Sequence, residues 1–464
     1  MTTTDRSPQP QFVSQAPKLG MVSGFDGIRG IGVCMVLVGH ALYKYVESWV
    51  TIVDSFFVLS GFLITTLLLQ EARSTGTIGL KKFYSRRAVR LLPSVWLFVG
   101  VWLVISTVCT IVGFEPLSLR YVGQDALAAV LYVYHLFFPN GLAVINPDVQ
   151  GNRTMWHLWT LSIEEWFYAA IAGTVLICVR RRWIVQLGVV MAMSVLAIGV
   201  ARWYAFTGFW QDDAGMVAGV RLALLQRPDA LMLGVVIAVF NAHLTDERLL
   251  RWRRGLLWAG TIGLVVWAVM LNLSSGLVRK LGGPYFDYLP VGPEEFTRPQ
   301  MLDTMYWFRF GHTLGAIAFA AIVICLARCS EWWLSRLWSW GPFCWMGRLS
   351  YTLYIWHALP YIILIALIGG ENASVPVQLL RTPILIAAAF AVSLPVYYLV
   401  ELRVLRMKLR FSAEKEVLDL RTGKMVNVDQ IDEVRSPDRT LAPEEAGPVS
   451  PDDDLAPDAT EPRP

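Results

Sequence analysis

The sequence contains few charged residues for its length. Of its 464 residues, 16% are charged and 55% are hydrophobic, and the mean hydropathy is +0.48. A chain with so little polar surface cannot fold as an ordinary soluble protein, so the composition indicates a multispanning membrane protein. Because length predicts the number of domains only for soluble chains, it does not indicate several domains here.

The sequence also lacks the motifs of soluble catalytic and metal sites. It contains no nucleotide-binding glycine loop, no GxSxG, no HExxH and no paired cysteines. The six cysteines, at positions 34, 109, 178, 325, 329 and 344, lie in apolar segments without the spacing of metal ligands or of a disulfide framework. We interpret them as small core residues, and we expect no metal cofactor and no nucleic-acid partner.

The two ends of the chain differ in composition from the part between them. Residues 1–20 are polar and lack the basic start, apolar middle and cleavage site of a signal peptide, so we expect a disordered segment and an uncleaved first helix that acts as the signal. Residues 411–464 are rich in proline and carry 14 acidic and 6 basic residues, which predicts a disordered cytoplasmic tail. The expected transmembrane domain therefore spans residues 21–410.

Apolar runs predict an all-α integral membrane protein with about ten transmembrane helices. The runs fall near 27–46, 50–70, 92–113, 157–179, 184–204, 216–240, 256–274, 309–327, 344–367 and 378–400. Basic clusters lie at 73–90, 180–182, 248–254, 328–336 and 403–410. The positive-inside rule places every cluster in the cytoplasm only if the shorter run at 126–138 does not cross, which puts both termini in the cytoplasm.

The first apolar run, FDGIRGIGVCMVLVGH, contains ionisable residues that are costly in a membrane. Arg29 and His40 are separated by three helical turns, so they share one face about 16 Å apart along the axis, and Asp26 lies one turn before Arg29. Ionisable residues inside a membrane span usually indicate function. A neutral imidazole can accept a proton from a hydroxyl, although a structural hydrogen bond from His40 to another helix is the alternative.

Arginines cluster where the third apolar run begins, in FYSRRAVRLLPSVW. Arg86, Arg87 and Arg90 lie at the expected cytoplasmic boundary, and Arg87 and Arg90 are one turn apart on one face. Guanidinium groups in this arrangement suit phosphate. Anchoring by the positive-inside rule explains the same residues equally well.

Polar residues also interrupt the second and fourth runs. In DSFFVLSGFLIT, Ser60 and Gly61 either line a passage or pack closely against another helix. In WHLWTLSIEEWFY, His157 and Glu164 are two turns apart on one face, and Glu165 follows. Glu164 is expected to orient a histidine, to bind an acceptor hydroxyl, or to pair with an arginine such as Arg221 or Arg227.

Two later segments complete the set of intramembrane polar residues. In SYTLYIWH, Tyr354 and His357 share a helix face, which predicts either a polar track or hydrogen bonds between helices. Arg227-Pro228-Asp229 is expected to place an ion pair and a kink in the middle of the sixth helix.

Taken in order, these segments resemble the acyltransferase-3 family of bacterial membrane proteins, and the resemblance extends over residues 21–405. The blocks that carry it are FDGIRGIGVCMVLVGH, DSFFVLSGFLIT, FYSRRAVRLLPSVW, WTLSIEEWFY, RPDALMLG and GRLSYTLYIWH. The resemblance implies a multi-pass protein of the bacterial plasma membrane that transfers an acyl group, by default acetyl, from cytoplasmic acyl-CoA. The implied acceptor is a hydroxyl of a sugar, glycolipid, polysaccharide or similar molecule of the cell envelope.

The resemblance also assigns roles to residues. The implied catalytic residues are His40, as base, with Arg29, Asp26 and Glu164. The implied donor-binding residues are Arg86, Arg87, Arg90, Ser60 and Gly61. The implied acceptor-binding residues are His157, Glu165, Asp229, Tyr354 and His357.

Two mechanisms and two other function classes stay open at this point. His40 either deprotonates the acceptor for direct attack on the thioester or carries the acyl group itself. A transporter of a small molecule or of an acyl-modified lipid or glycan is the main alternative function, since it would use the same ionisable groups as a pathway. A scaffold that recruits partners through its acidic tail is the third class.

Overall fold

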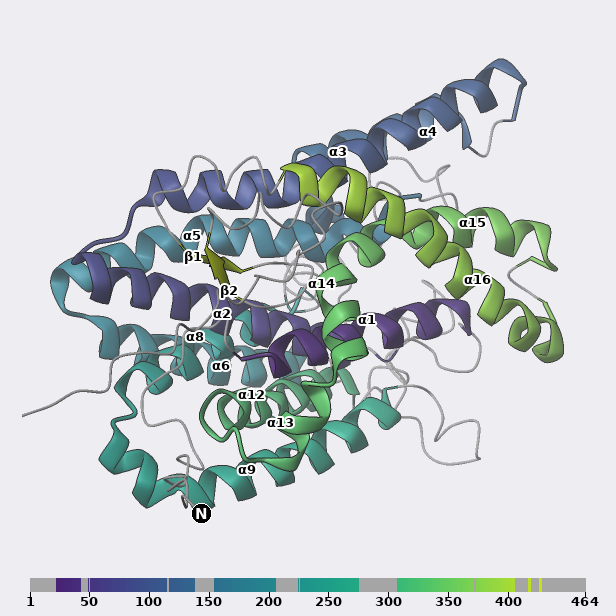
Figure 1. Ribbon diagram of the computed structural model, residues 1–464. Coiled ribbons are helices and arrows are strands. Elements are labelled where there is room, and N and C mark those ends of the chain that lie inside the picture. The colour runs from purple at the N-terminus through teal and green to yellow at the C-terminus, as the bar shows by residue number, and fades with distance from the viewer. Residues whose placement is uncertain are drawn as a thin grey trace, which may run out of the picture.

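The protein is a bundle of long helices in the computed structural model (Figure 1). The structure describes residues 22–42, 49, 51–114, 117–137, 154–205, 224, 226–274, 307–370, 373–404, 416–418 and 425–427. The α-helices are α1 (Gly24–Ala41), α2 (Thr51–Thr75), α3 (Leu80–Ile111), α4 (Leu119–Val130), α5 (Trp159–Arg181), α6 (Ile184–Ala205), α8 (Pro228–His243), α9 (Asp246–Leu273), α12 (His312–Arg328), α13 (Trp333–Trp338), α14 (Gly341–Trp356), α15 (Ala358–Leu367) and α16 (Val375–Val396). Short 3-10 helices are η3 (Tyr134–Phe137) and η6 (Trp156–Leu158), and π-helical turns are η8 (Trp307–Gly311) and η9 (Tyr397–Glu401).

Each of the ten apolar runs contains a helix in the structure. Within the described residues, seven helices are long and apolar enough to cross a membrane, or eight if the bent pair α14 and α15 forms one span. The remaining two runs correspond to α1, with 18 residues, and to α8, with 16. The run at 126–138 contains only the end of the 12-residue α4 and the turn η3, and neither is a candidate span. The count of ten crossings and the position of the termini stay predictions.

A proline explains the bend between α14 and α15. The two helices meet at 57° with only His357 between them. Pro360 has no N–H to bond the carbonyl of Trp356, and its ring crowds that carbonyl. The helix therefore bends at His357, the residue between α14 and α15.

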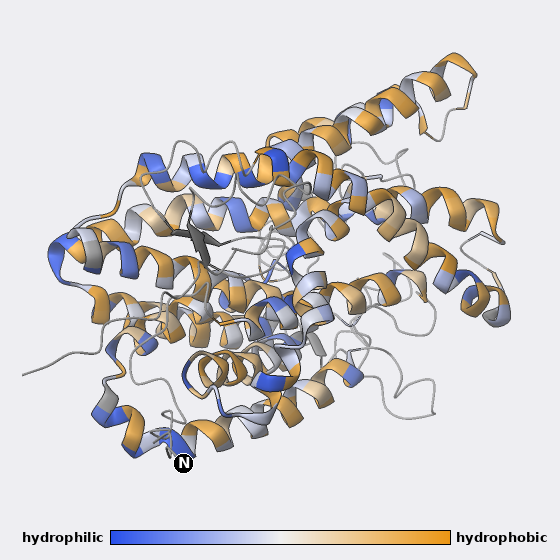
Figure 2. Cartoon of the chain, viewed as in Figure 1, coloured by the Kyte–Doolittle hydropathy of each residue, from blue (hydrophilic) through white to orange (hydrophobic). Residues whose placement is uncertain are grey.

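The helix ends that carry basic residues lie at the same end of the bundle, as expected for a chain whose helices cross a membrane in alternating directions. Contacts between α2 and α8 advance in the same direction along both helices, because Gly61 lies against Leu231 and Arg73 donates to the carbonyl of Ala242. Figure 2 shows hydrophilic turns after α2, α5 and α8 at one end of the molecule, beyond largely apolar helices. The basic clusters of these turns are thus gathered at one end, as the positive-inside rule predicts.

Close backbone contact between α1 and α14 positions the first helix. A Cβ atom at Gly30 would overlap the carbonyl oxygen of Phe343, and one at Gly347 would overlap that of Asp26. Small residues allow helix backbones to approach in this way inside a membrane. The contacts advance along both helices in the same direction and reach His40 and His357, so the C-terminal ends of α1 and α14 lie together.

Two strands lie in the predicted tail. β1 (Glu416–Leu418) and β2 (Met425–Asn427) pair antiparallel, with Val417 opposite Val426. The predicted disordered segment at 1–20, and the rest of the tail beyond residue 404, lie outside the described residues.

Substituting Gly30 by alanine is expected to destabilise the protein by about 1–3 kcal/mol, because the added methyl group has to separate α1 from α14. Gly173→Ala is the matched control, since a Cβ there meets nothing within 4 Å, and it should be neutral or stabilising by up to about 1 kcal/mol. Thermal unfolding of the purified protein in detergent measures both, and equal midpoints for the two variants would contradict the close-contact interpretation.

Candidate active site

Three histidines from distant parts of the chain meet at one end of the bundle. His40 is in the last turn of α1, His157 in η6 and His357 at the end of α14. His40 Nδ1 lies 2.8 Å from His357 Nε2, and the rings of His157 and His357 are 5.2 Å apart between centroids. His157 and His357 are buried, whereas His40 is partly exposed, so His40 is the member of the cluster that a substrate can reach.

Backbone carbonyls near the bend of α14 hold the two buried rings. His157 Nε2 lies 3.0 Å from the carbonyl oxygen of Ile355, and His357 Nδ1 lies 2.7 Å from that of Tyr354. The Tyr354 hydroxyl donates to the carbonyl of His157 at 2.5 Å and lies 2.7 Å from the Thr160 hydroxyl. Tyr354, predicted to bind the acceptor, therefore braces η6 and α5 against α14.

The sequence-predicted glutamates form a second cluster with other partners. Glu164 accepts hydrogen bonds from Ser60 at 2.9 Å and from Tyr168 at 3.2 Å. Glu165 pairs with Arg87 at 3.2 Å, and the Arg87 guanidinium lies 3.6 Å from the centroid of the Tyr168 ring. The cluster thus joins α2, α3 and α5 through one arginine, two carboxylates and two hydroxyls.

Of the alternatives for Glu164, the ion pair with Arg227 does not form. Arg227 lies instead 3.8 Å from Asp54, and the second arginine considered, Arg221, lies outside the described residues. Among the described residues, the hydrogen-bond partners of Glu164 are hydroxyl groups, and none of these residues places a positive charge at hydrogen-bond distance from its carboxylate.

The predicted donor-binding residues are not equivalent. Arg86 pairs with Glu71 at 3.0 Å and Arg87 with Glu165, so carboxylates offset both charges. Arg29 is 3.5 Å from Asp26, as the spacing in α1 predicts. Arg90 is exposed and forms no ion pair with a described residue, and it is near enough to Arg29 for the two charges to repel. Among these arginines, Arg90 therefore has the positive charge that is least offset by a carboxylate and most available to bind an anion.

Gly61 and Ser60 have separate roles although they are adjacent. A Cβ at Gly61 would overlap the carbonyl oxygen of Leu231, and one at Gly234 would overlap that of Val58. Close packing of α2 on α8 thus accounts for Gly61, whose role in donor binding stays a prediction. Ser60 is partly exposed and hydrogen-bonds Glu164.

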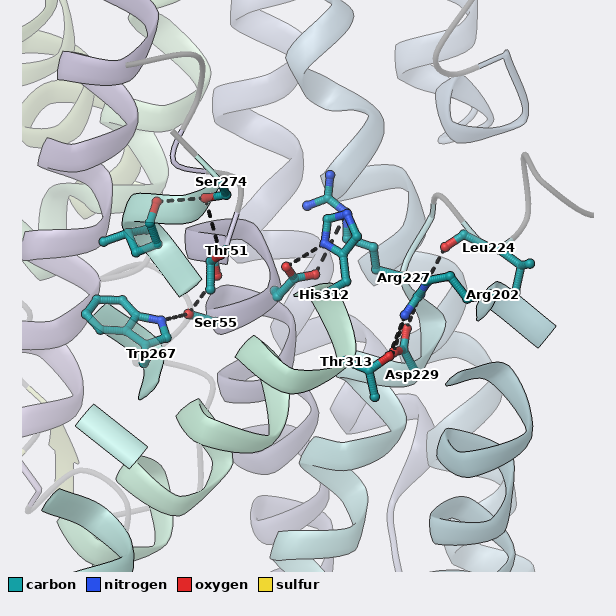
Figure 3. A network of polar contacts seen from close by, with 12 residues as sticks. Thr51, Ser55, Arg202, Leu224, Arg227, Asp229, Trp267, Ser274, His312 and Thr313 are labelled. Atoms are coloured by element: carbon teal, nitrogen blue, oxygen red, sulfur yellow. Dashed lines mark hydrogen bonds and ion pairs between the residues drawn. The ribbon is translucent and has the colours of Figure 1, made fainter. Parts of the chain in front are cut away.

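A buried polar network joins the ends of α2, α6, α8 and α12 (Figure 3). Arg202 donates to both carboxylate oxygens of Asp229, at 2.7 and 2.9 Å, and the Thr313 hydroxyl also donates to this carboxylate. In the other half, His312 Nδ1 lies 2.8 Å from Asp54 Oδ2. The network places two aspartates opposite two arginines, which balances charge where water is excluded.

This network corrects the interpretation of Arg227-Pro228-Asp229. The expected mid-helix kink is wrong, because α8 begins at Pro228, preceded by Arg227 with φ 55°. The two charged residues also pair with different helices rather than with each other. Arg202 and Thr313 together occupy both carboxylate oxygens of Asp229, and its expected contact with an acceptor stays a prediction.

Two ionisable members of this network, Arg202 and His312, were missed by sequence reasoning. Both lie in apolar runs, so the rule that flagged His40 applied to them as well. The pairing itself could not be predicted, because Arg202 and Asp229 are 27 positions apart and lie in different helices.

Substituting Asp229 by asparagine is expected to lower the free energy of unfolding by about 3 kcal/mol, because it leaves the Arg202 charge buried and unpaired. Glu247→Gln removes an ion pair with Arg251 that is exposed, at 74% and 87% of the two side chains, and should change stability by less than about 1 kcal/mol. Denaturant titration in mixed micelles measures the free energy of unfolding of both variants. An equal loss in both would show that the buried ion pair stabilises the protein no more than the exposed pair does.

Comparisons with known proteins assign the chain to a family. Residues 22–400 match the family described as acyltransferase domain, acyltransferase 3, and the chain belongs to this family. No solved structure matches the chain. In the part of the chain that the structure describes, no three His, Cys, Asp or Glu side chains are arranged to hold a metal ion.

The curated relatives are bacterial O-acetyltransferases by name. The chain is 26% identical over 376 residues to "O-acetyltransferase OatA" of Staphylococcus aureus, covering 79% of this chain and 55% of that protein. It is 26% identical over 372 residues to "Putative peptidoglycan O-acetyltransferase YrhL" of Bacillus subtilis, covering 78% and 50%. The chain thus spans about half the length of the curated relatives it matches.

Proposed function

We propose that the protein is a membrane O-acyltransferase that moves an acyl group, by default acetyl, from acyl-CoA to a hydroxyl of a cell-envelope glycan or glycolipid. The observation that carries the proposal is the partly exposed His40, backed by the buried His357, within a chain of the acyltransferase-3 family. The names of OatA and YrhL support acetyl as the group and peptidoglycan sugars as the first acceptors to test.

His40 is the general base of the proposed reaction. Its imidazole takes the proton of the acceptor hydroxyl, the hydroxyl oxygen bonds the thioester carbonyl carbon, and the carbon–sulfur bond breaks. The products are the O-acyl ester and the CoA thiol, which receives the proton. General base catalysis of this kind contributes about 10²- to 10⁴-fold to the rate. An acyl-histidine intermediate on His40 is the other route to the same products.

The donor lies at the opposite end of α1. The phosphates of CoA need positive charge that carboxylates have not already offset, and Arg90 fits this need best, because it is exposed, forms no ion pair with a described residue and lies near Arg29 at the start of α1. Arg86 and Arg87, each paired with a glutamate, hold α3 in place beside this position. Arg29 and His40 are about 16 Å apart along α1, a distance suited to an extended donor whose thioester reaches toward the base.

The first test is transfer of labelled acetyl from acetyl-CoA in membranes that contain the full chain, with peptidoglycan fragments and envelope glycolipids as acceptors. His40→Ala should lower ester formation by about 10²-fold or more. His243→Ala is the control, because His243 is exposed and bonds only the carbonyl of Val239 in its own helix. Equal labelling with His40→Ala and wild type, at equal protein levels, would remove His40 from the reaction.

A second test separates donor binding from chemistry. Arg90→Gln is expected to raise the KM for acetyl-CoA about tenfold with a smaller effect on kcat, because it removes a charge that contacts phosphate rather than the reacting atoms. Arg251→Gln removes an exposed arginine of α9 and should leave both constants unchanged. A KM unchanged by Arg90→Gln would move the donor phosphates to another part of the protein.

A further inference from the structure

His357 connects the partly exposed His40 to the backbone of α14. Its Nε2 lies 2.8 Å from His40 Nδ1, and its Nδ1 lies 2.7 Å from the carbonyl oxygen of Tyr354 and 3.2 Å from that of Leu353. The side chain is 1% exposed. His357 therefore has no contact with solvent and acts only through the groups that it touches.

These contacts determine which ring nitrogens carry protons. A carbonyl oxygen only accepts hydrogen bonds, so His357 Nδ1 must carry a proton. A second proton on Nε2 would place a positive charge among buried rings, which is unfavourable in a low-dielectric interior. His357 Nε2 is thus the acceptor, and His40 Nδ1–H is the donor. A neutral His40 then has its lone pair on Nε2, the nitrogen that does not face His357.

The same arrangement stabilises the charge that forms when His40 accepts a proton. His40 is in the last turn of α1, and the C-terminal end of a helix carries partial negative charge that stabilises a cation. His357 stands between α14 and α15, and its Nδ1 faces the carbonyl oxygens of Leu353 and Tyr354. The positive charge on the two rings therefore faces the end of α1 and these two carbonyls.

We propose that His357 is the positioning residue for His40: it accepts the Nδ1 proton of His40, which leaves Nε2 as the base, and it shares the positive charge during transfer. This inference rests on the proposed acyltransferase function and reassigns His357 from the acceptor contact expected from sequence.

Two amide variants of the full-length protein in lipid nanodiscs test the proposal. In His357→Gln, the glutamine amide lies about as far from the backbone as Nε2 of the histidine ring. Its amide nitrogen can face the carbonyls of Leu353 and Tyr354 while its amide oxygen accepts from His40. In His357→Asn, the asparagine amide lies only about as far from the backbone as Nδ1, so the contact with His40 is lost. His243→Asn is the matched control, since His243 Nδ1 also lies 2.8 Å from a carbonyl four residues earlier but touches no other histidine in the described part of the chain.

We expect His357→Asn to lower kcat about 10²-fold with little change in either KM, and His357→Gln to recover at least about tenfold of that loss. Nitrogen-15 spectra of histidine-labelled protein give a readout that a merely structural role would not move. His40, assigned by its absence in His40→Ala, should show a protonated Nδ1 and a bare Nε2 in wild type and in His357→Gln, and a mixture of tautomers in His357→Asn.

The two levels of the hypothesis fail in different ways. No transfer by the wild type with any acceptor would overturn the proposed function and the inference with it. Transfer by the wild type and equal transfer by His357→Asn, or an unchanged His40 tautomer in that variant, would overturn the inference alone. An equal loss in His357→Asn and His357→Gln with the tautomer retained in both would also overturn it.

Discussion

The site depends on the direct contact between the backbones of α1 and α14. Gly30 and Gly347 leave no space between the two helices, and this contact fixes both the separation and the register of everything further along them. His40 follows Gly30, and His357 follows Gly347, at the same distance along their helices, which is why the two rings meet. Without the glycines, the two imidazoles would belong to helices that pass at a larger distance.

The polar residues of the bundle fall into groups that differ in charge. The group at the C-terminal ends of α1 and α14 consists of imidazoles, hydroxyls and backbone carbonyls. Its hydrogen bonds can all form between uncharged groups, so the group is neutral. The network of Arg202, Asp229, Asp54 and Arg227 is charged but balanced. The group around Arg90 and Arg29 keeps an excess of positive charge. In the proposed mechanism, proton transfer and anion binding take place at opposite ends of one helix.

Much of this arrangement was predictable from the sequence, for a physical reason. Apolar runs and basic turns gave a helix in each of ten ranges, because lipid demands long apolar helices and orientation follows positive charge. The i, i+3 pair of Asp26 and Arg29 is confirmed, since one helix determines its geometry. The acyltransferase-3 family, suggested by ordered motifs, is confirmed by a match over residues 22–400.

Pairings between helices were not predictable, because nothing local specifies them. His40 and His357 are 317 positions apart, and Glu165 was not expected beside Arg87. Nothing local in the sequence showed that carbonyls in the last turn of α14 would face His157 and His357. Arg227 and Asp229 were misassigned as partners because adjacent charges in a sequence point in different directions once a helix begins between them.

The glycine contact makes the spacing of the two imidazoles sensitive to events far from them. Gly30 and His40 are ten positions apart on one rigid helix, so a small tilt of α1 against α14 at the glycines becomes a larger displacement at the rings. A hydrogen bond of 2.8 Å tolerates little of this before it breaks. The displacement is smallest at the glycine contact and largest at the imidazole pair, which lies farthest from it. Anything that changes helix tilt, including the thickness of the surrounding bilayer, acts on the alignment of the two imidazoles.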